Sequence, residues 1–364
     1  DTGKLVTSPT TTVAAYLQHW IADVRGPQVR PKTRTWYEQA IRCHIVPQIG
    51  SQRLDKLTPE HVRQMVTAIQ TSASTASAQQ AHRTLATALK DAVDEGIVER
   101  NVAAIVRRPK HSGVIRREFT FEESREIIRV AAQLDDQVWG ARVVLAFMTG
   151  ARPGELLGLR WQYVDLDAGN IEIAWHLQEM KMKHGCAETY QSDTKEHIPS
   201  CVRTRPGFCP QAKYDVAPGL TYEPCYRSLA FTPVKTRAGN RVVPMLPIVV
   251  ALLRQMYDTD QPSQNDLVFH HPDGRPYAPH DDTEMWKALL KQAGLPPDAV
   301  GYQSRHTAAT LMRRAGADEA LRMSIMGHSS AIAHRGYAHV DQSEKLAALN
   351  PLASLADPSS TPPS

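Results

Sequence analysis

Five short motifs of cationic and polar residues carry the side chains of this chain that are best suited to binding or catalysis. Two hold arginines, Arg152 in "TGARPGELLGLRW" and Arg305 in "GYQSRHTAATLM". A third holds Lys235 in "VKTRAGNRVVPM", and a fourth holds His328 in "MGHSS". Tyr337, in "YAHV", follows nine residues after that histidine. Taken singly, each has an ordinary explanation, such as a helix cap, a solvated lysine, an ion pair or a surface tyrosine.

Taken together, these residue types suit the binding and transfer of one phosphate diester. Two guanidiniums can hold the non-bridging oxygens of a phosphate in a bidentate manner. Such charge stabilisation is the largest contribution to this kind of chemistry. A tyrosine can attack phosphorus if neighbouring cations help it to ionise, because its ordinary pKa is roughly 10. A lysine or histidine can then protonate the leaving 5′-oxygen. With no recurrent carboxylate cluster, the motifs make a poor metal site.

The spacing of apolar residues predicts the elements that must position these motifs. In the first hundred residues it predicts four helices, over 11–25, 32–50, 58–70 and 75–97. Farther along it predicts helices over 120–134, 139–150, 151–161, 247–257, 281–294 and 303–315, and short strands over 169–175 and 240–245. We expect Lys235 on or near the tip of a hairpin, with a turn at Ala238–Gly239. The predicted fold class is α+β, mostly α, with a small antiparallel sheet.

A length of 364 residues indicates two domains or three. We place a helical domain at 1–106, a basic linker at 107–118, and a second domain at 119–350. The second domain carries a cysteine-rich insert at 176–228, and the Pro/Ser-rich residues 351–364 are expected to form a flexible tail.

Charge is distributed unevenly, and the basic part lies at the front. Residues 1–118 carry 17 Lys and Arg against 10 Asp and Glu, whereas residues 119–364 carry 25 against 28. A basic first third indicates a polyanionic partner, and DNA is the obvious candidate. A solvated tether is the alternative for the linker. The candidate DNA-binding residues are Arg30, Lys32, Arg34, Arg107, Arg108, Lys110, Arg116 and Arg117.

The sequence contains no run of eighteen apolar residues and does not open with the pattern of a signal peptide. We therefore expect a soluble, cytoplasmic protein with no membrane partner. The first residue is Asp1, so we also expect a fragment or a trimmed form of a longer protein.

Four cysteines, Cys186, Cys201, Cys209 and Cys225, lie within forty residues of one another in the insert. In a cytosolic protein such a cluster indicates metal binding or reduced thiols, not disulfides. A zinc site made of four cysteines, or of three cysteines and a histidine, would close a long loop of little apolar content. A mobile surface insertion is the alternative, because the spacings match no standard zinc knuckle.

The motifs, in this order, resemble the boxes of the tyrosine recombinase (phage integrase) family. The resemblance spans residues 140–340 and rests on "TGARPGELLGLRW", "KTRAGNRVVP", "RHTAATLM" and "MGHSS" followed by Tyr337. Residues 10–105 are similar to the family's helical, SAM-like core-binding domain in their pattern of helices. The resemblance implies a tyrosine-recombinase catalytic domain and site-specific DNA recombination, by which a phage or other mobile element is integrated and excised.

The resemblance also implies a role for each box. Arg152 and Arg305 would clamp the scissile phosphate, Lys235 would be the general acid, and His328 would hydrogen-bond the phosphate. Tyr337 would be the nucleophile that forms a covalent 3′-phosphotyrosyl link and frees a 5′-hydroxyl. Because that link conserves the bond energy, neither ATP nor a metal cofactor is implied.

The chain departs from the family pattern at Tyr302, since the family usually has histidine three residues before the second arginine. Tyrosine can donate one hydrogen bond but cannot match histidine at proton transfer near pH 7. We expect Tyr302 to suffice. The alternatives are that His306 compensates or that activity is weakened. Glu155, three residues after Arg152, would orient the arginine from behind.

The implied partners are double-stranded DNA attachment or core sites, a homotetramer on two duplexes, and an accessory DNA-bending or directionality factor. They place the protein at the nucleoid of a bacterial or phage-infected cell. The amphipathic segment 341–352 suits exchange between subunits, or packing within its own subunit. Two alternative functions stay open. One is a resolving recombinase dedicated to a chromosome or plasmid, and the other is a DNA-binding regulator on a weakened recombinase scaffold.

Overall fold

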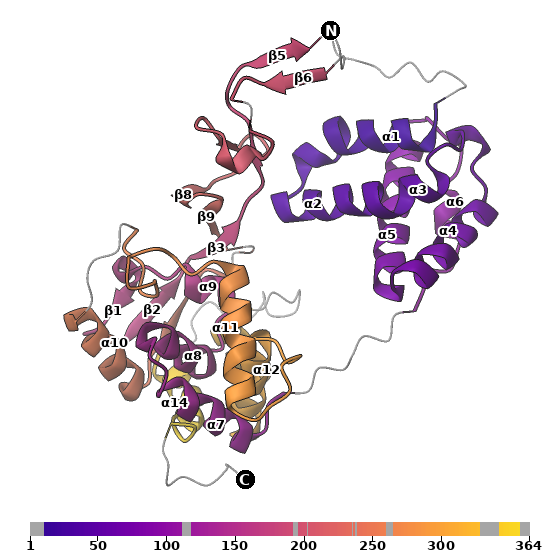
Figure 1. Cartoon of the computed structure of the whole chain (residues 1–364). Coiled ribbons are helices and arrows are strands. Elements are labelled where there is room, and N and C mark those ends of the chain that lie inside the picture. Colours follow the sequence, from indigo (N-terminus) through magenta and orange to yellow (C-terminus); the bar gives the residue numbers. More distant parts are fainter. Residues whose placement is uncertain are drawn as a thin grey trace. The chain divides into compact units, whose positions relative to one another are not determined.

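The computed structural model describes residues 11–110, 118–191, 196–201, 203–234, 236, 239–259, 265–327 and 342–356 (Figure 1). The chain divides into two compact units. The first is Asp1–Ile115 with Lys213–Leu220, and the second is Arg116–Ala212 with Thr221–Ser364. Among the described residues, no helix is both long and apolar enough to cross a bilayer.

Helices build the first unit, and the predicted helical segments are present. Two of them are interrupted by π-helical turns, Trp20–Val24 and Ile41–Ile45. Short 3-10 turns follow at Gly26–Gln28 and Leu54–Lys56. The α-helices are α1 (Val13–His19), α2 (Pro31–Ala40), α3 (Val46–Ile49), α4 (Pro59–Ser72), α5 (Thr75–Asp94) and α6 (Val102–Ile105).

The long helix α5 is the element on which this unit packs. Its inward side is mostly alanine and leucine, which lets neighbouring helices approach closely. The hydroxyl of Tyr16 in α1 donates to the Ala88 carbonyl at 2.8 Å, and the indole of Trp20 donates to Asp91 at 2.7 Å. The buried His82 ring lies within hydrogen-bonding distance of two carbonyls at α6, 3.1 and 3.0 Å away. These side chains therefore join α5 to α1, to the π-helical turn after α1 and to α6 by hydrogen bonds.

In the second unit, helices surround the apolar helix α8. Every residue of α8 from Trp139 to Thr149 is buried, and the helix packs against α7, α10, α12 and α14. A helix that is apolar on all sides must lie in a core. The helices of this unit are α7 (Phe121–Ala131), α8 (Gln137–Thr149), α9 (Pro153–Leu157), α10 (Pro247–Thr259), α11 (Pro279–Gln292), α12 (Tyr302–Arg314), α13 (Glu319–Met326) and α14 (Gln342–Ala353).

Two three-stranded antiparallel sheets, consecutive along the chain, form the strand ladder of the second unit. The chain runs out along β2 (Asn170–Ile173) and β3 (Trp175–Glu179) and returns along β9 (Leu229–Pro233) and β10 (Arg241–Pro244). β1 (Val164–Asp165) adds to β2, and β8 (Glu223–Tyr226) adds to β9 through a bulge. The predicted small antiparallel sheet is therefore present.

The predicted hairpin around Lys235 is wrong. β9 pairs with β3 and β10 pairs with β2, so the two strands that flank Lys235 do not pair with each other. The chain leaves the ladder after Val234, whose amide donates to the Ala174 carbonyl at 3.0 Å, and rejoins it at Arg241, opposite Ile173. Lys235 itself lies outside the described residues.

The insert starts where β3 ends and returns where β9 begins. It contains β4 (Met182–Lys183), β5 (Glu188–Gln191), β6 (Glu196–Pro199) and β7 (Lys213–Tyr214), and β8 follows them as the chain returns to β9. β5 and β6 pair as an antiparallel hairpin, with Glu188 opposite Pro199 (Figure 1).

The C-terminal segment folds farther along the chain than expected. Helix α14 runs to Ala353, and Leu349, Leu352 and Leu355 are buried in the core of the second unit. The predicted end of the second domain, at residue 350, is therefore too early. Leucines beyond it pack in the core, although the surrounding residues are rich in Pro and Ser. In this structure the segment packs within its own subunit.

One buried ion pair holds α8 to α11. Arg142 and Asp282 lie 2.6 Å apart with almost no exposure, and the Trp139 indole donates to the same carboxylate at 3.0 Å. We predict that Asp282→Ala destabilises the second unit by about 3–5 kcal/mol, because it leaves Arg142 buried without a counter-charge. Urea unfolding measures this free energy.

The control is Asp167→Ala, since Asp167 forms an exposed ion pair with Arg254 at 2.8 Å. Solvent screens such a pair, so the control should unfold as the wild type does. Equal midpoints for the Asp282 variant and this control would contradict the prediction.

Candidate active site

Three arginines among the described residues converge on the C-terminal end of α13. The carbonyls of residues 325–327 each accept a hydrogen bond from a different guanidinium. Arg241 in β10 donates to the first at 2.6 Å, and Arg305 in α12 donates to the second. Arg152, the residue that caps α9, donates to the third at 3.4 Å. The last carbonyls of a helix lack partners within the helix and form its negative end, so cations are stabilised there.

Glu155 lies beneath two of these guanidiniums and is itself buried, with 4% of its surface exposed. It accepts from Arg152 Nη1 at 2.7 Å and from the Arg152 amide at 2.9 Å. It also accepts from Arg241 at 2.9 and 3.4 Å. Burial acts to raise the pKa of Glu155, but Arg241 and then Arg152 lower it to about 2. The carboxylate is therefore ionised at neutral pH and fixes both arginines.

Arg305 is held more deeply than Arg152. It is 1% exposed, and Nη1 donates to the Gly150 carbonyl at 2.6 Å. Its buried Nε has no partner among the described residues. Burial, then the charges of Arg152 and Arg241, lower the pKa of Arg305 to about 10, against the opposing influence of Glu155 and Tyr302. The guanidinium stays charged at neutral pH but lies in a strongly positive environment.

The described groups of this cluster carry more positive than negative charge. Arg152, Arg241 and Arg305 surround the single carboxylate of Glu155. The Arg152 side chain is 36% exposed and presents the excess charge to solvent. Guanidiniums held in this way bind a phosphate oxygen without first having to be ordered.

Tyr302 and His306 lie on the outer side of α12, one helical turn apart. Their rings meet edge-on with centroids 5.1 Å apart, and Tyr302 is 37% exposed. Tyr302 also influences the pKa of Arg305, so the phenol lies near that guanidinium. The partly exposed phenol offers a hydrogen-bond donor to an anion on the solvent side of α12.

Several predicted site residues fall outside the described residues. They are Lys235, His328, Tyr337, Arg116 and Arg117. The described chain stops at Gly327, the residue before His328, and resumes at Gln342. The roles given to these residues stay predictions.

Sequence reasoning missed Arg241. It stands in "KTRAGNRVVP" with two other cations, Lys235 and Arg237, and only Lys235 was singled out there. The available signal was strand alternation, because Arg241 and Val243 share the buried side of β10. A cation on the buried side of a strand needs a buried partner, and Glu155 supplies it.

The candidate DNA-binding residues of the first unit are mostly exposed. Arg30 and Lys32 lie at the start of α2, where Lys32 sits 6.0 Å from the exposed Trp36 ring. Arg34 is partly buried and pairs with Glu38 at 3.1 Å. In the segment after α6 the exposed cations are Arg107, Arg108 and Lys110. Basic residues that interleave with an exposed aromatic ring suit a nucleic-acid backbone.

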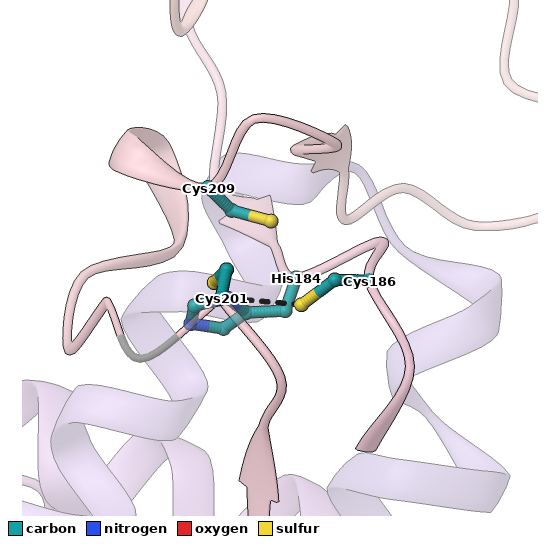
Figure 2. Close-up of side chains that lie close together, drawn as sticks. All are labelled: His184, Cys186, Cys201 and Cys209. Atoms are coloured by element: carbon teal, nitrogen blue, oxygen red, sulfur yellow. Dashed lines mark hydrogen bonds between the residues drawn. The ribbon is translucent and has the colours of Figure 1, made fainter. Parts of the chain in front are cut away.

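The predicted metal ligands need one correction. His184, Cys186, Cys201 and Cys209 gather with their potential ligand atoms within 4.8 Å of one another (Figure 2). Cys225 is not in this group, because it belongs to β8 and packs against the core of the second unit. Burial raises the pKa of Cys225 to about 12, despite Arg160 nearby. Of the two ligand sets considered, the described group therefore matches three cysteines and a histidine, with His184 as the histidine.

Two family models match the chain. The phage integrase N-terminal SAM-like domain matches residues 12–69, and the phage integrase family matches residues 227–344. An integrase of Saccharopolyspora erythraea is 30% identical over 349 residues, which cover 90% of this chain and 79% of that protein.

Two solved structures share the fold. The Tn1549 transposon integrase in complex with a circular intermediate DNA has a TM-score of 0.67 at 17% identity, covering 93% of this chain and 98% of that chain. The lambda integrase tetramer bound to a Holliday junction has a TM-score of 0.59 at 18% identity, covering 91% of this chain and 81% of that chain.

The charge of Glu155 predicts a pH-dependent stability. Its folded pKa of about 2 lies below the ordinary value of 4.5. Ionisation therefore stabilises the fold above about pH 4.5, and that stabilisation is lost as the pH falls toward 2. We predict that Glu155→Gln costs roughly 3 kcal/mol at pH 7, and that this difference shrinks by about 1.4 kcal/mol for each pH unit below 4.5.

The measurement is the free energy of unfolding of wild type and variant between pH 3 and 7, with the exposed Glu99→Gln as control. A difference between Glu155→Gln and wild type that stays constant down to pH 3 would show that the carboxylate charge does not hold the arginines.

Proposed function

The chain belongs to the phage integrase family of tyrosine recombinases, and from this premise we propose that it is the site-specific DNA recombinase that integrates and excises a phage or other mobile element. The observation that carries the proposal is the arginine cluster at the end of α13. Arg152 and Arg305, predicted as the phosphate clamp, come from different elements and meet there around Glu155. Such fixed positive charge suits a phosphate whose negative charge grows during reaction.

The reaction we propose exchanges one phosphate ester for another. The Tyr337 oxygen attacks the scissile phosphorus, and the bond from phosphorus to the 5′-oxygen breaks. The phenol gives its proton to solvent water, Lys235 gives one to the leaving oxygen, and Lys235 then recovers a proton from solvent, so the protons balance. The strand is then held as a 3′-phosphotyrosine, and His328 donates a hydrogen bond to the phosphate.

The same step in reverse joins the new strands. A 5′-hydroxyl from the partner duplex attacks the phosphotyrosine, and Tyr337 is released. Each step breaks one phosphate ester and makes one, so we propose that the reaction needs neither ATP nor a metal cofactor.

The proposed substrate is a double-stranded DNA core site, which the basic residues of the first unit and of the linker contact. We propose that a homotetramer acts on two duplexes, as the lambda integrase tetramer bound to a Holliday junction illustrates. An accessory DNA-bending or directionality factor completes the assembly at the nucleoid, in the cytoplasm.

The nucleophile can be tested with a nicked duplex that carries the repeated core site flanking the gene. We predict that the wild type forms a covalent protein–DNA adduct and that Tyr337→Phe lowers its yield at least about 10³-fold, because the attacking oxygen is gone. Denaturing electrophoresis measures the adduct. Tyr257→Phe, which alters an exposed tyrosine of α10, is the matched control.

A mobility-shift measurement shows whether each variant still binds the duplex. An adduct that survives Tyr337→Phe would refute the assignment of the nucleophile.

One observation favours a second function, a DNA-binding regulator on a weakened scaffold. Tyr302 occupies the place where the family usually carries histidine, and its partly exposed phenol is a poor proton donor near neutral pH. A regulator would bind the core site without forming an adduct.

Substitutions at Tyr302 and His306 separate these functions. If the Tyr302 hydroxyl donates one hydrogen bond to the phosphate, we predict that Tyr302→Phe slows adduct formation about 10-fold, that Tyr302→His preserves it, and that His306→Ala changes it little. Single-turnover cleavage rates measure these effects. A large loss in His306→Ala would assign the role to His306, and an adduct that appears only in Tyr302→His would support the regulator.

A further inference from the structure

The insert between β3 and β9 carries a cluster of side chains that the recombination chemistry does not use. We propose that His184, Cys186, Cys201 and Cys209 bind one Zn²⁺ ion that closes the base of the β5–β6 hairpin. His184 and Cys186 lie on the chain that enters β5, and Cys201 lies just after β6 ends. Cys209 follows the 3-10 turn Pro206–Phe208. Figure 2 shows the four side chains turned toward one another.

The spacing of the ligand atoms fits a tetrahedral zinc ion. Cys201 Sγ lies 3.4 Å from His184 Nδ1, Cys186 Sγ lies 4.0 Å from the same nitrogen, and all four ligand atoms lie within 4.8 Å of one another. Zinc–sulfur bonds of about 2.3 Å and zinc–nitrogen bonds of about 2.0 Å place neighbouring ligand atoms about 3.5–3.8 Å apart in a tetrahedron. Small shifts of the side chains would therefore admit the ion.

The donor set selects the metal and the kind of site. Three sulfurs and one imidazole suit zinc and disfavour hard cations such as Mg²⁺ and Ca²⁺. Because the protein supplies all four ligands, no coordination position is left for substrate, as in structural sites.

Backbone amides already support the sulfurs. The amide of Arg203, two residues after Cys201, donates to that sulfur. The amides of Gly185 and Gln211 donate to Cys209, and Gln211 again stands two residues after the cysteine. Such hydrogen bonds orient thiolates toward a metal.

The insert has little else to hold it together. Among the residues of 181–222 whose burial the structure describes, Cys209 alone is buried, and Phe208 is 66% exposed. A segment that buries so little apolar surface needs another source of stability, and a structural metal provides one. A disulfide between two of the cysteines is the competing explanation, although thiols stay reduced in the cytosol.

The test begins with the metal content of the full-length protein, purified without chelator and measured by mass spectrometry. We expect about one zinc per chain, and less than about 0.2 in Cys201→Ser and in His184→Ala. Cys225→Ser and Cys43→Ser are the matched controls and should keep the zinc, because both residues lie outside the cluster.

Two further measurements on the wild type do not depend on the folding of a variant. Co²⁺ exchanged into the site should give the visible absorption of a tetrahedral cobalt thiolate. Removal of zinc with a chelator should speed proteolysis within 181–222 at least about tenfold, since binding stabilises the folded insert by mass action.

The proposal is overturned if the wild type contains no zinc after expression in zinc-supplemented medium, or if thiol titration of the unfolded protein reveals a disulfide. It is also overturned if zinc stays in both Cys201→Ser and His184→Ala, or if the metal-free insert resists protease as the loaded one does. None of these outcomes bears on the recombinase assignment, which the adduct assay tests separately.

Discussion

The hydrogen bonds at the C-terminal end of α13 hold together the elements of the second unit that carry the arginine cluster. The last carbonyls of this helix, at residues 325–327, would lack partners in an isolated helix. Instead they receive guanidiniums from β10, from α12 and from the residue that caps α9. This network of hydrogen bonds thus joins β10 to the helices α9, α12 and α13. It also fixes where the chain leaves α13, at Gly327, whose φ of 65° is readily adopted only by a residue without a Cβ.

The same network brings three positively charged guanidiniums close together, and their mutual repulsion costs free energy. The carbonyls of α13 and the ionised Glu155 offset part of it, while burial first, and then the charges of Arg152 and Arg241, lower the pKa of Arg305. A phosphate would relieve the remainder. The fold therefore fixes positive charge at the end of α13, so an anion that binds there would require little reorganisation of the protein. The apolar packing around α8 supplies the rigid frame for this arrangement.

Sequence reasoning found what local patterns encode and missed what long-range packing decides. The helices followed from apolar spacing, because an amphipathic or fully apolar run has few other ways to bury its surface. Arg152 and Arg305 were singled out from their sequence motifs, and the structure brings both to the end of α13, while their role stays a prediction. Arg241 did not, because only the pairing of β10 with β2 turns that side chain inward, toward Glu155. The hairpin at Lys235 failed for the same reason, since strand partners lie far apart in the sequence. His184 replaced Cys225 because the path of the insert, not residue spacing, selects the cluster.

The two ends of the insert meet in the ladder. The Met180 amide donates to the Ser228 carbonyl at 2.8 Å, and Glu179 lies opposite Leu229. Strands of the second unit therefore hold the two ends of the insert together. The entropic cost of closing a loop grows only slowly with its length. The register that turns Arg241 toward Glu155 is set by the pairing of β10 with β2, outside residues 181–222. A change of length within 181–222 therefore carries little cost in the pairing of β3 with β9, because that pairing is made by residues on either side of the range.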